Sequence, residues 1–222
     1  MKVFYYTFAA IFYDGKLMDS EVKDKIIERA SSLFTENGIK GITMDDLAQY
    51  MGMSKRTIYE YFRDKEELID ECVLYLEQLH EQRMKHISDQ SENMFELLMR
   101  IYQESLMNMQ KINKKFIDDI KKYFPEIRER HDRKKEENIR ESVLFFQEGI
   151  NEGWIKSELN PEILSLIISE EMELLFNGNF SLSSKFSFFD VYKTLFFIFL
   201  RGIATNKGMK IIDNFVQKEV NK

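Results

Sequence analysis

The sequence predicts an all-α protein of about nine helices, with a small N-terminal domain of three helices and a larger helical domain after it. Three observations support this fold class. Apolar residues recur at spacings of three and four along most of the chain, as on one face of a helix. Only two of the 222 residues are proline, so few positions interrupt a helix. Aromatic residues make up 14% of the chain and Met occurs 12 times, a composition that suits adaptable helical interiors.

Residues 1–17 do not follow the pattern of the rest of the chain. Residues 3–13 are apolar and aromatic except for Thr7, a run too short to span a bilayer. The segment supplies only a poor cleavage site for a signal peptide. Met18 precedes Asp-Ser-Glu, a typical acidic and capping entry to a helix. We therefore expect the biological start at Met18 and treat residues 1–17 as a leader; the alternative is a genuine N-terminal arm that packs on the body.

The first predicted helix of the body covers residues 22–37 and carries one apolar stripe. Asn37-Gly38 ends it. The second helix is short: Thr43 is its expected N-cap, and two aspartates follow in the first turn, where the helix dipole favours carboxylates. Gly52 ends this helix, because a left-handed residue costs least at glycine.

A third short helix, residues 54–62, follows at once. Ser54 is its expected cap, and Ile58 and Phe62 face inward at i and i+4. Two short helices joined by a three-residue turn that contains glycine form a helix-turn-helix, whose second helix enters the major groove of DNA. Asp64 is the expected cap of the next, long helix, over about residues 65–86.

Three of these segments resemble a known family: Thr43-Met-Asp-Asp-Leu-Ala, Gly52-Met-Ser-Lys, and Ile58-Tyr-Glu-Tyr-Phe-Arg-Asp-Lys-Glu-Glu-Leu. They are similar to the DNA-binding domain of TetR-type (TetR/AcrR) transcriptional regulators, over about residues 22–72. The resemblance implies a homodimeric transcriptional repressor that binds double-stranded DNA at a palindromic operator. A small apolar or amphipathic effector would release it from that operator. Glu60 departs from the family, where an aromatic or basic residue is frequent. We expect its side chain either to point away from DNA or to contribute to base choice.

The start of the recognition helix is the end that reaches base edges. Arg56 can donate a bidentate pair to guanine, and the methyl group of Thr57 can touch thymine. By resemblance to the family, the residues placed to contact phosphates beside the groove are Thr43, Tyr59, Tyr61 and Lys65. Such contacts position the protein without reading sequence. The expected DNA-binding residues are Thr43, Ser54, Lys55, Arg56, Thr57, Tyr59, Tyr61 and Lys65.

The rest of the chain carries further predicted helices at about 94–110, 112–123, 125–151, 161–177 and 187–206. We therefore divide the body into a DNA-binding domain at 18–66 and a ligand-sensing and dimerisation domain at 67–222. The middle of the second domain is rich in Met and aromatic residues. Any one of them is more often core, whereas the resemblance implies that a subset lines an effector cavity. The candidates are Phe95, Met99, Tyr102, Gln103, Phe116, Ile120, Tyr123 and Phe146.

The last two predicted helices, 161–177 and 187–206, are apolar almost all round, so they need cover on several sides. Lys193 and Arg201 interrupt the second one, which excludes a membrane span. A second copy of the chain is the simplest partner that could bury the remaining apolar surface. Two such helices per subunit would then form a four-helix bundle across a two-fold axis. The expected interface residues are Ile167, Glu171, Leu174, Leu195 and Phe199.

Charge and composition exclude several other classes of protein. A net charge of −6 argues against a nonspecific polyanion binder. The single cysteine, Cys72, fits a reducing bacterial cytoplasm and is expected to be a small buried hydrophobe. The histidines have no metal-ligand spacing, and no nucleophile elbow or phosphate-binding glycine loop occurs, so we expect no enzyme, cofactor or metal. Two alternatives remain: a DNA-bound structural or partner-binding protein of the same fold without a ligand, and an enzyme on a helical scaffold.

Overall fold

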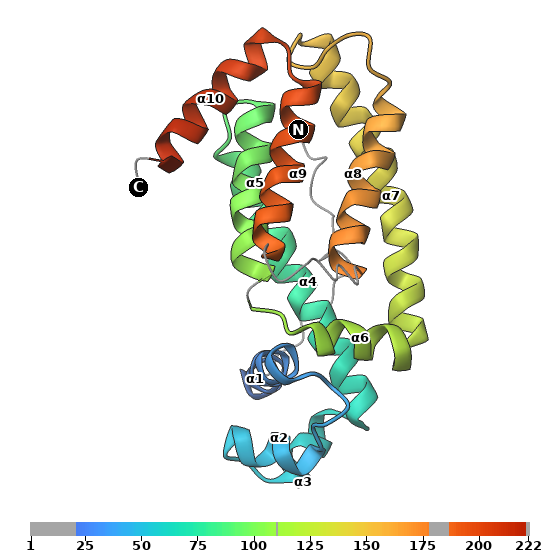
Figure 1. Cartoon of the computed structure of the whole chain (residues 1–222). Coiled ribbons are helices and arrows are strands. Elements are labelled where there is room, and N and C mark those ends of the chain that lie inside the picture. The colour runs from blue at the N-terminus through green and yellow to red at the C-terminus, as the bar shows by residue number, and fades with distance from the viewer. Residues whose placement is uncertain (1–20, 110, 178–186, 221–222) are drawn as a thin grey trace. The chain divides into compact units, whose positions relative to one another are not determined.

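The computed structural model describes residues 21–109, 111–177 and 187–220, without the side chains of residues 109, 172–177, 188 and 218–220. The expected leader and the boundary at Met18 lie outside the described residues. Regular structure in the described part is α-helical apart from an isolated bridge between Ile155 and Ala204, which confirms the predicted all-α class. The helices (Figure 1) are α1 Glu21–Asn37, α2 Met44–Met51, α3 Lys55–Tyr61, α4 Lys65–Asp89, α5 Met94–Met109, α6 Lys114–Tyr123, α7 Pro125–Asn151, α8 Pro161–Asn177, α9 Phe188–Ile203 and α10 Asn206–Val220.

The last predicted helix, 187–206, is wrong at its end, and α10 was not predicted. α9 stops at Ile203 because Ala204 is extended, with φ −70° and ψ 138°. This extended step pairs with the loop after α7: the backbone N–H of Lys156 donates to Ile203 O at 3.0 Å, and that of Thr205 donates to Trp154 O at 3.0 Å. A long-range backbone pairing thus separates α9 from α10.

By its internal contacts the chain divides into two compact units. The HTH unit comprises the described parts of residues 9–83 and 107–134, and the C-terminal unit comprises those of residues 84–106 and 135–222. α6 and the first turns of α7 therefore belong with α1, α2 and α3, whereas the expected domains were two continuous ranges. α4 contributes residues to both units.

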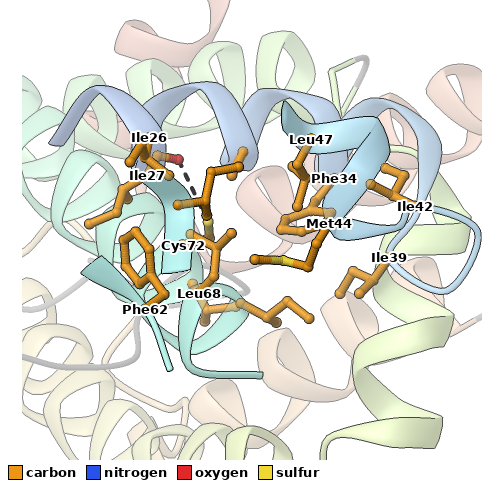
Figure 2. Packing of buried hydrophobic residues seen from close by; sticks show 14 of the residues in the cluster. Ile26, Ile27, Phe34, Ile39, Ile42, Met44, Leu47, Phe62, Leu68 and Cys72 are labelled. Atoms are coloured by element: carbon orange, nitrogen blue, oxygen red, sulfur yellow. Dashed lines mark hydrogen bonds between the residues drawn. The ribbon is translucent and has the colours of Figure 1, made fainter. Parts of the chain in front are cut away.

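The core of the HTH unit consists of apolar side chains on the inner faces of its helices. Phe34 of α1, Leu47 of α2, Ile58 of α3 and Leu68 of α4 are all fully buried. Figure 2 shows part of this cluster, with side chains from α1, α2 and α4 pointing toward one another. Burial of such side chains stabilises the fold by roughly 1.5–3 kcal/mol each, so the short α2 and α3 are held by packing on α1 and α4.

The C-terminal unit has a core of stacked aromatic rings. The ring of Tyr102 on α5 stacks on those of Phe196 and Tyr192 on α9, with centroid distances of 4.3 and 5.2 Å. Phe146 on α7 packs edge-on against Phe199 of α9 at 6.1 Å. Such pairs contribute about 0.5–1.5 kcal/mol beyond their buried area. α5, α7 and α9 therefore enclose one aromatic interior.

Apolar side chains also lie on the surface of the C-terminal unit. Those exposed by 40% or more are Leu144, Ile163, Leu166, Ile167 and Ile198. Within the described ranges, no helix is both long enough and apolar enough to cross a lipid bilayer.

Candidate nucleic-acid interface

The helix-turn-helix forms as its local sequence predicts. Thr43 Oγ1 accepts from the backbone N–H of Asp46 at 3.2 Å, and the carboxylate of Asp46 accepts from the backbone N–H of Thr43 at 2.7 Å. These two bonds form a reciprocal capping box at the start of α2. The hydrogen bonds from Thr43 lower the pKa of Asp46. Gly52 ends α2 in the left-handed region, at φ 68°, which is the conformation that favours glycine.

The recognition helix α3 is capped and anchored on one side. Ser54 Oγ accepts from the backbone N–H of Thr57 at 3.0 Å, so the expected cap is confirmed. Ile58 and the following Phe62 are buried, at 0% and 1% exposure. Lys55, Arg56 and Tyr59 are exposed on the other side. The helix thus presents its basic N-terminal turn to solvent while its apolar face is fixed in the core.

Both basic residues of that turn lie beside an acid. Lys55 Nζ donates to Asp45 at 2.8 Å, and this hydrogen bond raises the pKa of Lys55. Arg56 Nε lies 3.5 Å from Glu60, although the Arg56 side chain is 90% exposed. Exposed ion pairs of this kind contribute little to stability, so contacts with DNA can replace them. Glu60, which departs from the TetR pattern, therefore lies along the helix beside Arg56.

Three of the four residues expected at phosphates, namely Thr43, Tyr59 and Tyr61, have different surroundings. Tyr59 is 45% exposed, whereas Tyr61 is half-buried and packs against the core of the HTH unit. The hydroxyl of Thr43 both accepts from Asp46 N and donates to the Asp46 carboxylate at 2.6 Å. A hydroxyl has a single hydrogen to donate, so Thr43 would have to leave this bond before it could donate to a phosphate.

Lys65, also expected at a phosphate, is engaged inside the HTH unit. Its Nζ donates to the backbone carbonyls of Ile39, at 2.7 Å, and of Ile42. Burial lowers the pKa of Lys65, and the charges of Asp119 and Asp46 oppose that effect. An ammonium group has three donors, so a single N–H remains for another partner. A phosphate contact of Lys65 stays a prediction.

The eight candidates for an effector cavity fall in both units. Phe95, Met99, Tyr102 and Phe146 are buried in the C-terminal unit, each at 2% exposure or less, and Gln103 is half-buried there. Phe116 belongs to the core of the HTH unit, and the partly buried Ile120 packs against that core. Tyr123, exposed by 39%, accepts a hydrogen bond from Lys40 Nζ at 2.9 Å. Which of these residues contact an effector stays a prediction.

The residues expected at the dimer interface differ in how exposed they are. Ile167 is 40% exposed on α8, and burial raises the pKa of Glu171, which lies one turn further along. Leu195 is half-buried. Phe199 is only 8% exposed, because its own chain covers it. The side chain of Leu174 is outside the described residues.

Sequence reasoning missed three polar residues that the structure singles out. Glu77 on α4 is 3% exposed, and neither of its carboxylate oxygens has a hydrogen-bond partner among the described residues. Asn113 and Asp119, at α6, make hydrogen bonds to the backbone at the end of α1 and in the turn after it. Each sits at an ordinary polar position of an amphipathic helix or its cap, so local pattern carried no signal of these partners.

The remaining reactive groups are unremarkable in their positions. Cys72 is buried, its thiol donates to Ile27 O at 3.6 Å (Figure 2), and burial raises its pKa to about 12. This agrees with the expected role as a small core residue. No group of three or more His, Cys, Asp or Glu side chains suited to a metal ion occurs in the described part of the chain.

Comparisons with known proteins point to one family. A family profile described as bacterial regulatory proteins, tetR family, matches residues 26–72. The chain is 27% identical over 128 residues to the biofilm operon icaADBC HTH-type negative transcriptional regulator IcaR of Staphylococcus epidermidis, covering 46% of this chain and 69% of that protein. It is 38% identical over 52 residues to the regulator of the same name from Staphylococcus aureus, which is 23% of this chain and 28% of the relative's length.

A solved structure supports the fold over most of the chain. The putative transcriptional regulator from Saccharomonospora viridis in complex with choline has a TM-score of 0.71 and 17% identity, and the match covers 85% of this chain and 100% of that one. The family profile lies on the capped helix-turn-helix described above, and the helical body follows the same fold. The helix-turn-helix of this chain matches the tetR family of bacterial regulatory proteins, and the relatives named above support a TetR-family transcriptional regulator.

Proposed function

We propose that this chain is a dimeric repressor that binds a near-palindromic operator in bacterial DNA and leaves it when a small-molecule effector binds. The observation that carries the proposal is the recognition helix α3: its basic first turn faces solvent while Ile58 and Phe62 fix its other side in the core. A helix that is held so firmly can present side chains to base edges in a defined register. The relative from Staphylococcus epidermidis, a negative transcriptional regulator by name, supports repression.

Arg56 is the residue proposed to read a base. Its guanidinium is 90% exposed at the start of α3, and its planar fork of donors matches the O6 and N7 acceptors of guanine. Glu60 lies beside Arg56 and can orient the guanidinium group if this ion pair persists on DNA. In that case Glu60 would contribute to base choice. Lys55 lies beside Arg56 at the helix start that reaches base edges, and Tyr59 is proposed to contact a phosphate beside the groove.

The test begins with selection of bound duplexes from a random pool by the purified protein, which supplies the operator. Arg56→Ala should then lose about 1–3 kcal/mol of binding free energy on that operator and relax the preference at one position per half-site. Arg128→Ala removes a positive charge from α7 whose side chain is 62% exposed, and it is the control for a general loss of positive charge. If Arg56→Ala weakens operator and random DNA equally, Arg56 is a phosphate ligand and does not read a base.

The dimer is proposed to form over the exposed apolar side chains of α8 and α9. Ile163, Leu166 and Ile167 lie within two turns of α8, and Ile198 of α9 is 63% exposed. Monomeric proteins rarely leave such residues grouped on one surface. A two-fold arrangement would bury the same surface on both copies and would set two α3 helices about 34–36 Å apart, on successive faces of the duplex.

The switch is proposed to act through α4, which contributes residues to both units. An effector can change DNA affinity only if it binds one arrangement of the two α3 helices more tightly than the other, typically by about 1–3 kcal/mol. Because the coupling is reciprocal, any true effector must bind less tightly when operator is present. A compound with equal affinity in titrations with and without operator is not the effector.

A further inference from the structure

The turn between α1 and α2, residues 38–42, is bound from α6 by a carboxylate. Asp119 Oδ2 accepts hydrogen bonds from the backbone N–H groups of Ile39, at 2.7 Å, and of Lys40, at 2.8 Å. Hydrogen bonds to an ionised acceptor are shorter and stronger than neutral ones. One oxygen atom, 80 residues away in the chain, therefore satisfies two consecutive donors of the turn.

The end of α1 is bound by Asn113, the N-cap residue of α6. The backbone N–H of Asn113 donates to Thr35 O at 2.7 Å, and its side-chain amide donates to Glu36 O at 2.9 Å. Asn113 Oδ1 at the same time accepts from the backbone N–H of Lys115 at 3.0 Å, which caps α6. The last carbonyls of a helix have no partner within it. Here a single residue supplies partners to two of them and starts α6 as well.

Gly38 allows this close approach. It ends α1 in the left-handed region at φ 85°, and a Cβ atom there would lie 2.9 Å from the Cβ of Lys115. Both the backbone conformation and the space therefore require glycine.

α4 binds the opposite, carbonyl side of the same turn. Lys65 Nζ donates to the carbonyls of Ile39 and Ile42, and both of these side chains are buried in the core. The turn is thus held between a carboxylate of α6 and an ammonium group of α4. We call these contacts of Asn113, Asp119 and Lys65 the turn clamp.

We propose that Asn113 and Asp119 are positioning residues for DNA reading: through the turn clamp, α6 sets the placement of α2 and α3, as a second attachment besides the covalent one from α3 to α4. Directional bonds to the backbone fix a turn more closely than apolar contacts, which can slide. The inference rests on the proposed function, in which α3 reads an operator. It assigns to α6 a part in sequence recognition although none of its residues needs to touch DNA.

The test compares Asp119→Ala with Asp118→Ala in the full chain. Asp118 is the exposed neighbour on α6, so both variants remove the same charge from nearly the same place. Asp119→Ala should bind the selected operator at least fivefold more weakly than Asp118→Ala, at the lower end of usual coupling, with affinities for random duplex equal within about twofold. Its amide hydrogens at Ile39 and Lys40 should exchange faster with solvent, whereas those of Asp118→Ala should match wild type.

Asp119→Asn separates positioning from folding, because its amide oxygen can still accept from the turn. The proposal expects this variant to recover most of the operator affinity. Equal operator affinity for Asp119→Ala and Asp118→Ala, with faster exchange at Ile39, would overturn the proposal. So would an equal loss on operator and random DNA, which indicates a role in folding alone. A wild-type protein that selects no sequence would refute the proposed function as well, and that result is seen before any variant is made.

Discussion

Replacement of Glu77 by glutamine is expected to stabilise the protein, and more so as the pH rises. Glu77 is 3% exposed on α4 and its carboxylate oxygens have no hydrogen-bond partner among the described residues. Burial raises the pKa of Glu77 from 4.5 to about 10. The positive charges of Arg130 and Lys134 on α7 oppose this shift, and the negative charges of Asp70 and Glu81 on α4 add to it. At neutral pH the folded protein therefore holds a proton that the unfolded chain has lost.

The size of the effect follows from linkage between proton binding and folding. The folded state binds more protons than the unfolded state between pH 4.5 and about 10, so stability falls as the pH rises through that range. At pH 7 the cost is roughly 3–4 kcal/mol, since each of the roughly 2.5 pH units above the unfolded pKa contributes about 1.4 kcal/mol. Glutamine has nearly the same shape and does not titrate. The difference between Glu77→Gln and wild type should be small near pH 4.5 and should reach roughly 3–4 kcal/mol at pH 7.

The assay is urea unfolding of wild type, Glu77→Gln and Glu66→Gln at pH 5, 6, 7 and 8, at one protein concentration. Glu66 is exposed near the start of the same helix, so its replacement is the control for the loss of a surface charge. Stabilisation by Glu77→Gln that is the same at pH 5 and pH 8 would refute the reasoning. It would mean that Glu77 is ionised in the folded protein, with its negative charge balanced by the positive charge of Arg130 or Lys134.

Three further predictions follow from the same structure. Lys65→Met should lower the free energy of unfolding, measured in urea, by about 2 kcal/mol, because the carbonyls of Ile39 and Ile42 lose a charged donor. Lys55→Met removes an exposed pair with Asp45 and should lower the free energy of unfolding much less. Equal losses in the two variants would refute the role of Lys65 in the turn. Cys72, with a pKa raised to about 12, should react with a disulfide reagent at pH 8 only as fast as the protein unfolds, and labelling of the native protein within seconds would contradict its burial. The double variant Ile167→Glu with Ile198→Glu should yield monomers by light scattering if α8 and α9 form the interface. Leu144→Glu is the comparison, because Leu144 is 67% exposed but lies on α7. An unchanged dimer in the double variant would exclude this surface.

The sequence by itself determined the features whose partners lie a few residues apart. The caps at Thr43 and Ser54 and the left-handed end at Gly52 need only a side chain and a backbone group within one turn. The inward positions of α3 follow from spacing along one helix, so Ile58 and Phe62 were predictable. For the same reason the helix-turn-helix, the all-α class and the family could be read from residues alone.

Only the tertiary structure decided the roles of residues whose partners come from elsewhere in the chain. Asp119 looks like any acid on an amphipathic helix, and its two hydrogen bonds reach a turn 79 and 80 residues away. Lys65 fits a phosphate ligand by its motif, yet its ammonium group lies on two carbonyls of that turn. The break between α9 and α10 depends on pairing of Ala204 with Ile155. Glu77 is buried by packing that its own helix does not encode, because the periodicity of one helix describes its faces and leaves open which neighbour covers them.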